Sequence, residues 1–298
     1  MAFSFGNLNT YVDEQSFSLI SKAVLNTDLM GKISVRAGLS AGTVAVNLMD
    51  GDFNVTAREC STFTPSGNIN FSQVNIVIAD KQMKMEVCPT QLRDYYMAQQ
   101  MSPSAVAGGE ELVFEEVIAD FYVKKIKEYN ETYLMQGDGV NDGIEAQIKA
   151  GSTNIPAGAA AWTVGNAIDQ ALDIYDAMSE KVKDRNDIIM LVSPANYRTL
   201  TRALVAANLY HYNFTDGTET LYLPGTNCSV VKTSGLTGSD FVAAGPAEMI
   251  IAGVGLVDET SDAFGAFYVP AEDTVKIRAY WRLGVAVAQS DLFGHNNL

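Results

Sequence analysis

The residues best suited to binding an ion or a phosphate lie together in one glycine-rich segment, residues 133–147, with the sequence YLMQGDGVNDGIEAQ. A calcium loop starting at Asp138 would need an oxygen ligand at its third position and a glutamate at its twelfth, where the chain has Val140 and Lys149. A phosphate-binding P-loop would need lysine and serine or threonine after its last glycine, but isoleucine and glutamate follow Gly143. The sequence therefore favours a helix end and a hinge at a domain junction, formed by Gly137, Gly139 and Gly143.

A second segment that could carry chemistry is GLSAG, residues 38–42, which matches the G-x-S-x-G nucleophile elbow of serine hydrolases. That elbow needs a strand before the serine, a helix after it and a histidine base. Here the strand-like segment TVAVNL follows Ser40, and the two histidines are His211 and His295. A soluble serine hydrolase that uses Ser40 is therefore kept only as the alternative from a different functional class, and no catalytic residue is assigned.

The composition is that of a globular protein with an acidic surface. A chain of 298 residues, 47% of them hydrophobic, can bury the cores of one or two domains. Lys and Arg total 20 against 35 Asp and Glu, and the formal charge of −15 disfavours broad binding to nucleic acid or to an anionic membrane. No apolar run approaches the roughly 18 residues that a bilayer requires, and the N-terminus lacks a secretory signal, so we expect a soluble intracellular protein.

The cysteines and the remaining polar residues indicate no metal or cofactor. Cys60, Cys88 and Cys228 are odd in number, far apart and without C-x-x-C spacing. This pattern predicts neither a disulfide framework nor a zinc site, and buried free thiols are the simpler interpretation. We therefore expect no cofactor and no metal.

The elements that must position these residues begin with a long β hairpin. The segments TVAVNL, FNVTAREC and VNIVIADKQMKMEV are strand-like, with turn residues at Asp50-Gly51 and at residues 65–68. Few charges and many asparagines suit a hairpin that lies on another polar surface. A hairpin that is solvated, or that folds onto its own domain, accounts for the composition equally well.

The clearest helix leads directly into the glycine-rich segment and spans about 25 residues, or roughly 37 Å. Its apolar residues recur at a spacing of three to four, which predicts an amphipathic helix: Phe114, Val117, Ile118, Phe121, Tyr122, Ile126, Tyr129 and Tyr133. Charged residues occupy the opposite side, which we expect to be solvated: Glu116, Asp120, Lys124, Lys127 and Glu131.

The second half of the chain predicts an α+β domain and a closing strand. A helix at residues 168–182, the strand DIIMLV, a helix capped by Ser193-Pro194 and several short strands follow one another. The last strand, VKIRAYWRLGVAVA, alternates between apolar residues and a face that carries Lys276, Arg278 and Arg282. These cations could bind phosphate, but in so acidic a chain we favour carboxylates of a neighbouring subunit as their partners.

The order of these parts resembles the major capsid proteins of tailed bacteriophages, whose fold is shared by herpesvirus capsid floors and encapsulin shells. The segments ETYLMQGDGVNDGI, MLVSPANYRTL and IRAYWRLGVAVAQSDLF resemble the end of their spine helix, their strand–proline–helix segment and their closing strand. The resemblance implies an α+β fold in five parts. These are an N-terminal arm (1–38), an extended β-hairpin loop (39–87), a peripheral domain with a long spine helix (88–150), an axial α+β domain (151–255), and a return to the peripheral sheet with the C-terminal strand (256–298).

The same resemblance implies a structural protein and no enzyme. Hexamers and pentamers of the chain would form an icosahedral shell around the phage genome, in the virion, after assembly in the host bacterial cytoplasm. The implied partners are the chain itself, portal and decoration proteins, packaged double-stranded DNA bound without sequence specificity, and no membrane. Because Met1 leads straight into the arm, we expect any scaffolding protein to be separate.

Two other functions are compatible with the same sequence features. An encapsulin-like shell around cargo enzymes uses the same fold, and a monomeric binding module would leave the arm and the hairpin without a role. The candidate subunit-interface residues are Phe53, Arg58, Glu59, Lys81, Lys84, Glu116, Asp120, Lys124, Lys276, Arg278 and Arg282.

Overall fold

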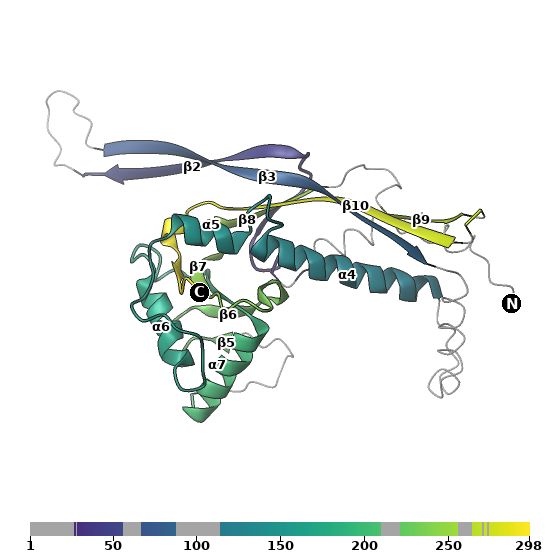
Figure 1. Cartoon of the computed structure of the whole chain (residues 1–298). Helices are drawn as coiled ribbons and strands as arrows, with labels where there is room; N and C mark the ends of the chain where they lie inside the picture. The colour runs from purple at the N-terminus through teal and green to yellow at the C-terminus, as the bar shows by residue number, and fades with distance from the viewer. Residues whose placement is uncertain are drawn as a thin grey trace, which may run out of the picture.

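The computed structural model describes residue 27 and residues 29–55, 67–87, 114–209, 221–255, 264–269, 271–272 and 274–298. These residues form two sheets (Figure 1). The larger sheet has the order β1-β8-β10-β3-β2, with β9 paired to β10, and the smaller has the order β11-β7-β4-β6-β5. The chain therefore has the α+β architecture that the sequence predicts.

Strand β10 lies at the centre of the larger sheet. It pairs antiparallel with β3 along one edge and with β8 and β9 along the other. Its residues from Val275 to Leu283 alternate between buried and partly exposed, which confirms the predicted alternation. The strands of this sheet are β1 Ser34–Arg36, β2 Gly42–Phe53, β3 Gly67–Val87, β8 Ile250–Gly255, β9 Phe264–Val269 and β10 Thr274–Val287.

The predicted long hairpin is formed by β2 and β3, and it extends beyond the rest of the molecule (Figure 1). The two strands pair from Gly42 opposite Ile78 to Phe53 opposite Gly67. Strand β3 then continues past the hairpin and pairs with β10. Because one strand belongs to both pairings, the hairpin is a direct extension of the larger sheet.

Helix α4, Phe114–Gln136, is the long helix that the sequence predicts, and it packs beneath β10 (Figure 1). Its Tyr122, Ile126 and Leu134 are buried in the same core as Trp281 of β10. The indole nitrogen of Trp281 donates a hydrogen bond of 2.9 Å to the side-chain oxygen of Asn130. This bond satisfies a buried polar group at the contact between helix and sheet.

Two details of α4 differ from the predicted division into an apolar and a charged side. Phe121 and Tyr129, predicted on the apolar side, are exposed, because the sheet covers only part of that side. Glu131, predicted on the solvated side, is only 2% exposed and accepts a hydrogen bond of 3.2 Å from the backbone nitrogen of Ser234. The 3₁₀ turn Ser234–Leu236 covers this end of the helix and removes Glu131 from water.

The smaller sheet lies between two helical layers. Helices α6, Ala167–Ala177, and α7, Pro194–Ala206, share a core with one of its faces, and α5, Ile144–Gly151, and α4 share a core with the other. Ser193 caps α7 as predicted, since its hydroxyl accepts a hydrogen bond of 3.2 Å from the backbone nitrogen of Asn196. The strands are β4 Ile188–Val192, β5 Leu221–Tyr222, β6 Ser229–Lys232, β7 Ala243–Pro246 and β11 Gly294–His295.

The strand pairing differs from the expected domain boundaries at two places. Strand β8, which falls in the range expected for the axial domain, pairs with β1 and β10 in the larger sheet. Strand β11, which falls in the tail expected to return to the peripheral sheet, pairs with β7 in the smaller one. Helix α6 also ends at Ala177, five residues before the predicted end. The first 26 residues of the expected arm, and residues 88–113, lie outside the described residues.

We expect the fold to lose stability on acidification through His295, which is fully buried in β11. Its Nδ1 accepts a hydrogen bond of 3.1 Å from the backbone nitrogen of Asn297, and its Nε2 lies 3.3 Å from the carbonyl oxygen of Ser152. Burial lowers the pKa of His295, the hydrogen bond to Ser152 partly offsets this, and the Lys149 ammonium adds to it. The unfolded chain therefore binds the additional proton more readily than the folded chain does.

The stability that neutral His295 contributes is thus present above the unfolded pKa of about 6.5 and is lost as the pH falls from there through the folded pKa, at up to about 1.4 kcal/mol per pH unit. Urea unfolding followed by circular dichroism at several pH values measures this slope. The variant His295→Gln should show a shallower slope below neutral pH. An equal slope in both proteins would show that other groups carry the pH dependence.

Candidate assembly surfaces

The glycine-rich segment forms a tight turn between α4 and α5. Gly137 has a positive φ of 79°, and a Cβ atom there would lie 2.2 Å from the carbonyl oxygen of Asn141. A Cβ atom at Gly143 would lie 2.4 Å from the carbonyl oxygen of Met135. These two glycines allow close backbone approach, whereas Gly139, with φ of 80°, has open space around it. The hinge role of the three glycines stays a prediction.

Asp138 connects this turn to the larger sheet. Its Oδ1 accepts hydrogen bonds from the backbone nitrogens of Val140 and Asn141, at 3.0 and 2.8 Å. Its Oδ2 lies 2.6 Å from the ammonium of Lys81 on β3, and that ammonium lies 4.0 Å from the centre of the Tyr133 ring. The hydrogen bond from Lys81, and then the backbone bonds, hold the pKa of Asp138 well below its usual value. Both carboxylate oxygens thus have partners within the chain.

The predicted cationic face of β10 is present, and it is joined by residues of β3 and β9. Lys276 forms an ion pair with Glu272, and Arg282 forms one with Asp80 at 2.8 Å. Arg278 lies opposite Lys84 in the strand register, and its guanidinium carbon is 5.7 Å from the centre of the Phe267 ring. A shallow depression of about 450 Å³ is lined in part by Lys84, Lys276 and Arg278. The structure therefore brings Lys84 of β3 next to Lys276 and Arg278 of β10, which lie far from it in the sequence.

The hairpin carries an exposed apolar pair that the sequence-based candidates did not include. Met49 and Phe71 lie directly opposite each other on β2 and β3 and are 72% and 78% exposed. Beside them, Gln73 donates a hydrogen bond of 3.2 Å to the side-chain oxygen of Asn47. An uncharged surface with two large apolar side chains in water is typical of a contact site. Strand alternation could have identified these two residues once the hairpin register was known.

The other candidate residues are spread over the larger sheet and α4. Asp120 and Lys124 are exposed on α4, as are Phe121 and Tyr129. Phe53 ends β2 and Glu116 lies in the first turns of α4, but their side chains fall outside the described part of the structure. Residues Arg58 and Glu59 also lie outside it.

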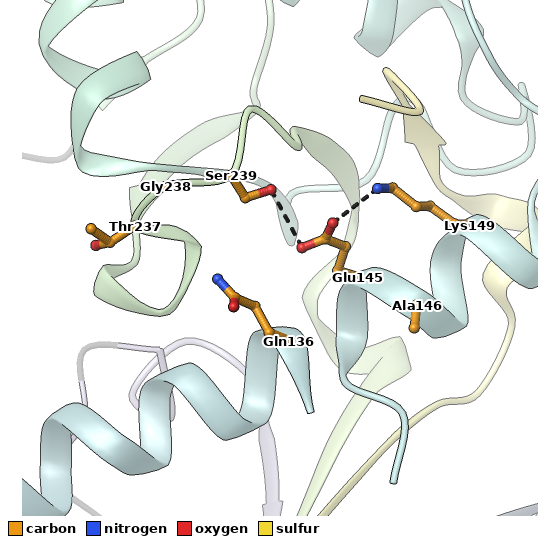
Figure 2. A pocket seen from close by; sticks show the side chains of 7 residues that line it. All are labelled: Gln136, Glu145, Ala146, Lys149, Thr237, Gly238 and Ser239. Carbon is orange, nitrogen blue, oxygen red and sulfur yellow. Dashed lines mark hydrogen bonds and ion pairs between the residues drawn. The ribbon is translucent and has the colours of Figure 1, made fainter. Parts of the chain in front are cut away.

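A pocket of about 420 Å³ lies where α4, α5 and residues 237–239 meet (Figure 2). Figure 2 shows Glu145 between Lys149 and Ser239, with its carboxylate 2.9 Å from the ammonium and 3.5 Å from the hydroxyl. Lys149 also donates a hydrogen bond of 2.7 Å to the carbonyl oxygen of Leu298. These bonds hold the charged groups to one another, which suits a structural contact between elements.

The surroundings of Ser40 do not match a nucleophile elbow. Ser40 is exposed, and strand β2 follows it where the elbow requires a helix. Of the two histidines, His295 has hydrogen bonds at both ring nitrogens, and His211 lies outside the described residues. Cys228 is buried, and burial raises the pKa of its thiol to about 12.

Within the described ranges, no group of three or more His, Cys, Asp and Glu side chains is placed to hold a metal ion. In the same part of the chain, no helix is both long enough and apolar enough to span a bilayer.

Comparison with solved structures identifies the fold. The capsid of a native GTA particle has a TM-score of 0.58 with 15% identity, over 92% of this chain and 89% of that one. The mature capsid of bacteriophage PhiM1 has a TM-score of 0.52 with 12% identity, over 91% and 86%. A virus-like particle from Pyrococcus furiosus also has a TM-score of 0.52 with 12% identity, over 95% and 98%. No protein-family model matches the chain, and no curated protein matches it in sequence.

These solved structures, two capsids and a virus-like particle, share their fold with this chain. The fold is that of the phage major capsid proteins, which confirms the resemblance in fold seen in the sequence. At identities of 10–15%, the similarity concerns the fold.

We expect Gly143→Ala to destabilise the folded chain more than Gly139→Ala does. Gly143 has an ordinary φ of −76°, but its new methyl group would collide with backbone atoms at the end of α4, and overpacking costs about 1–3 kcal/mol or more, at the upper end where the atoms in contact are backbone. Gly139→Ala meets no neighbour and only has to adopt a positive φ, which costs about 1–2 kcal/mol. Urea unfolding of both variants compares the two costs. Equal stabilities would mean that the close approach at Gly143 does not constrain the turn.

Proposed function

We propose that this chain is the major capsid protein of a tailed bacteriophage, and that it assembles through hexamers and pentamers into an icosahedral shell around double-stranded DNA. The observation that carries the proposal is the exposed pair Met49 and Phe71 on a hairpin that extends away from a capsid-type fold. The shell requires no enzyme activity and no cofactor.

The hairpin is suited to contact a neighbouring copy because it has an apolar surface without charge. Burying a Phe or Met side chain stabilises an association by about 1.5–3 kcal/mol before ordering costs. The strand pairing with β3 and β10 already orders the backbone, so little conformational entropy is lost on contact. Many copies of one modest contact make a closed shell stable.

The cationic face of β10 supports a second contact, with carboxylates of another copy. Lys84 and Arg278 face the same side of the sheet, in a chain with a formal charge of −15. A net negative charge is also compatible with a shell that encloses DNA without binding it tightly. The partners of the proposed shell are a separate scaffolding protein, portal and decoration proteins, and its locations are the virion and, during assembly, the host bacterial cytoplasm.

An encapsulin-like shell that encloses cargo enzymes is the second candidate function. It is favoured by the similarity to the Pyrococcus furiosus virus-like particle, which covers 95% of this chain and 98% of that one. The two shells differ in contents and share the subunit contacts proposed above.

Sedimentation of the purified chain, with electron microscopy of the fastest fraction, tests the shell function. We expect hollow polyhedral particles, and nuclease-sensitive contents would favour the phage capsid over the cargo shell. If the chain stayed monomeric even after addition of the products of its neighbouring genes, the shell function would be wrong. Labelling of Ser40 by a fluorophosphonate probe would support the hydrolase instead.

The double variant Met49→Thr with Phe71→Thr should raise the protein concentration needed for particles by about tenfold or more, because each tenfold step corresponds to only about 1.4 kcal/mol of lost contact. Threonine keeps the preference for strand structure, so the free energy of unfolding of the monomer should change little. Val140→Thr, at another exposed apolar residue, is the matched control and should assemble normally. Normal assembly of the double variant would exclude this pair as a contact.

A further inference from the structure

The outer helices of the smaller domain carry stripes of opposite charge. Asp169, Asp173 and Asp176 follow one another at spacings of four and three on α6 and are all exposed. Arg198 and Arg202 are four residues apart on α7 and are exposed as well. Residues at these spacings lie on one side of a helix, so we name the two sets the acidic stripe and the basic stripe.

Both stripes point away from the smaller sheet on the same side of the domain. The buried residues of α6 and α7 belong to one core with the side chains of Met190 and Val230, so both helices cover the same face of the sheet. Figure 1 shows the two helices together on the side of the small sheet away from the long hairpin. The opposite sides of these helices, which carry the stripes, therefore face outward next to each other.

The charge pattern is unfavourable for an isolated domain. Asp169 with Asp173 and Arg198 with Arg202 are like-charge pairs one helical turn apart, and such pairs weaken a helix. Asp176 lies beside the C-terminal end of α6, where the helix dipole disfavours a carboxylate. Asp169, in the first turn of α6, is favourably placed for the helix dipole, but a sequence that optimised the isolated helix would avoid Asp173 and Asp176.

The charged groups of the two stripes also have no hydrogen-bond or ion-pair partner within the described part of the chain. None of the five side chains forms a hydrogen bond or an ion pair with another described residue. By contrast, Lys125, Lys149 and Arg185 all form ion pairs with nearby carboxylates. Val205 lies three residues after Arg202 on the same side of α7 and is 57% exposed, which adds an apolar group to the basic stripe.

We propose that α6 and α7 form an interface between copies of this chain, in which the acidic stripe of one copy lies against the basic stripe of another. A partner for this surface must present both signs of charge on two adjacent helices, and a second copy has that layout. Polyanionic DNA would meet the acidic stripe beside the basic one and be repelled by it. Complementary stripes determine the relative orientation of two copies, because any arrangement that places like charges together is unfavourable. Their contribution to the affinity is smaller.

The test compares four variants of the full chain by sedimentation. Asp173→Lys with Asp176→Lys reverses the acidic stripe, and Arg198→Glu with Arg202→Glu reverses the basic one. A third variant carries all four changes and exchanges the signs. The fourth, Asp240→Lys with Asp291→Lys, is the control: it makes the same change in net charge as the acidic-stripe reversal, at exposed residues outside both stripes.

We expect each reversal alone to raise the concentration required for assembly by about tenfold, and the fourfold exchange to restore it. The control should assemble like the unchanged chain. The monomer of the acidic-stripe variant should be at least as stable in urea, because Asp169 then gains a lysine four residues along the helix. This separates a lost contact from a damaged fold.

The inference rests on the proposed shell function, and the outcomes separate the two. Particles from the unchanged chain, with reversals that assemble normally or an exchange that fails to restore assembly, would overturn the interface and leave the shell function intact. An unchanged chain that forms no assembly under any condition would overturn both.

Discussion

Strand β10 is the element on which the position of every other part depends. It pairs with β3 on one edge and with β8 and β9 on the other, and its Trp281 is buried against Asn130 of α4. Strand β3 forms the hairpin, and β8 follows directly after the smaller domain. One buried strand therefore sets the direction of the hairpin, the place of the long helix and the attachment of the smaller domain.

In the described part of the chain, the ion pairs between strands and turns stabilise this arrangement and do not form a ligand-binding site. Lys81 joins β3 to the turn after α4 through Asp138, and Arg282 joins β10 to β3 through Asp80. The partly buried ion pair between Lys81 and Asp138 contributes more to the stability of the fold than an exposed pair does. The Tyr133 ring and the backbone donors already restrict the two side chains, so little side-chain entropy is lost when they pair. Residues that resemble parts of an ion-binding loop thus connect two elements of the fold.

Features that depend on local sequence could be predicted, and features that depend on distant contacts could not. The alternation of β10, the length of α4 and the Ser193 cap follow from neighbouring residues. The burial of Glu131 requires a turn about a hundred residues later in the chain, and the partner of Lys81 lies 57 residues away. Among the contact surfaces, the cationic face was predictable from one strand, but the pairing of Met49 with Phe71 required the hairpin register.

The exposed surfaces differ in kind, and this difference bears on how a shell would assemble. An apolar pair such as Met49 and Phe71 supplies contact energy with little directional preference, whereas charged stripes discriminate between orientations at small gain in affinity. If both act in one assembly, the hairpin holds neighbouring copies together while the stripes on α6 and α7 select the correct relative orientation. Because each contact is weak, a wrongly placed copy can dissociate before it forms further contacts. A correctly placed copy forms several contacts at once and is retained.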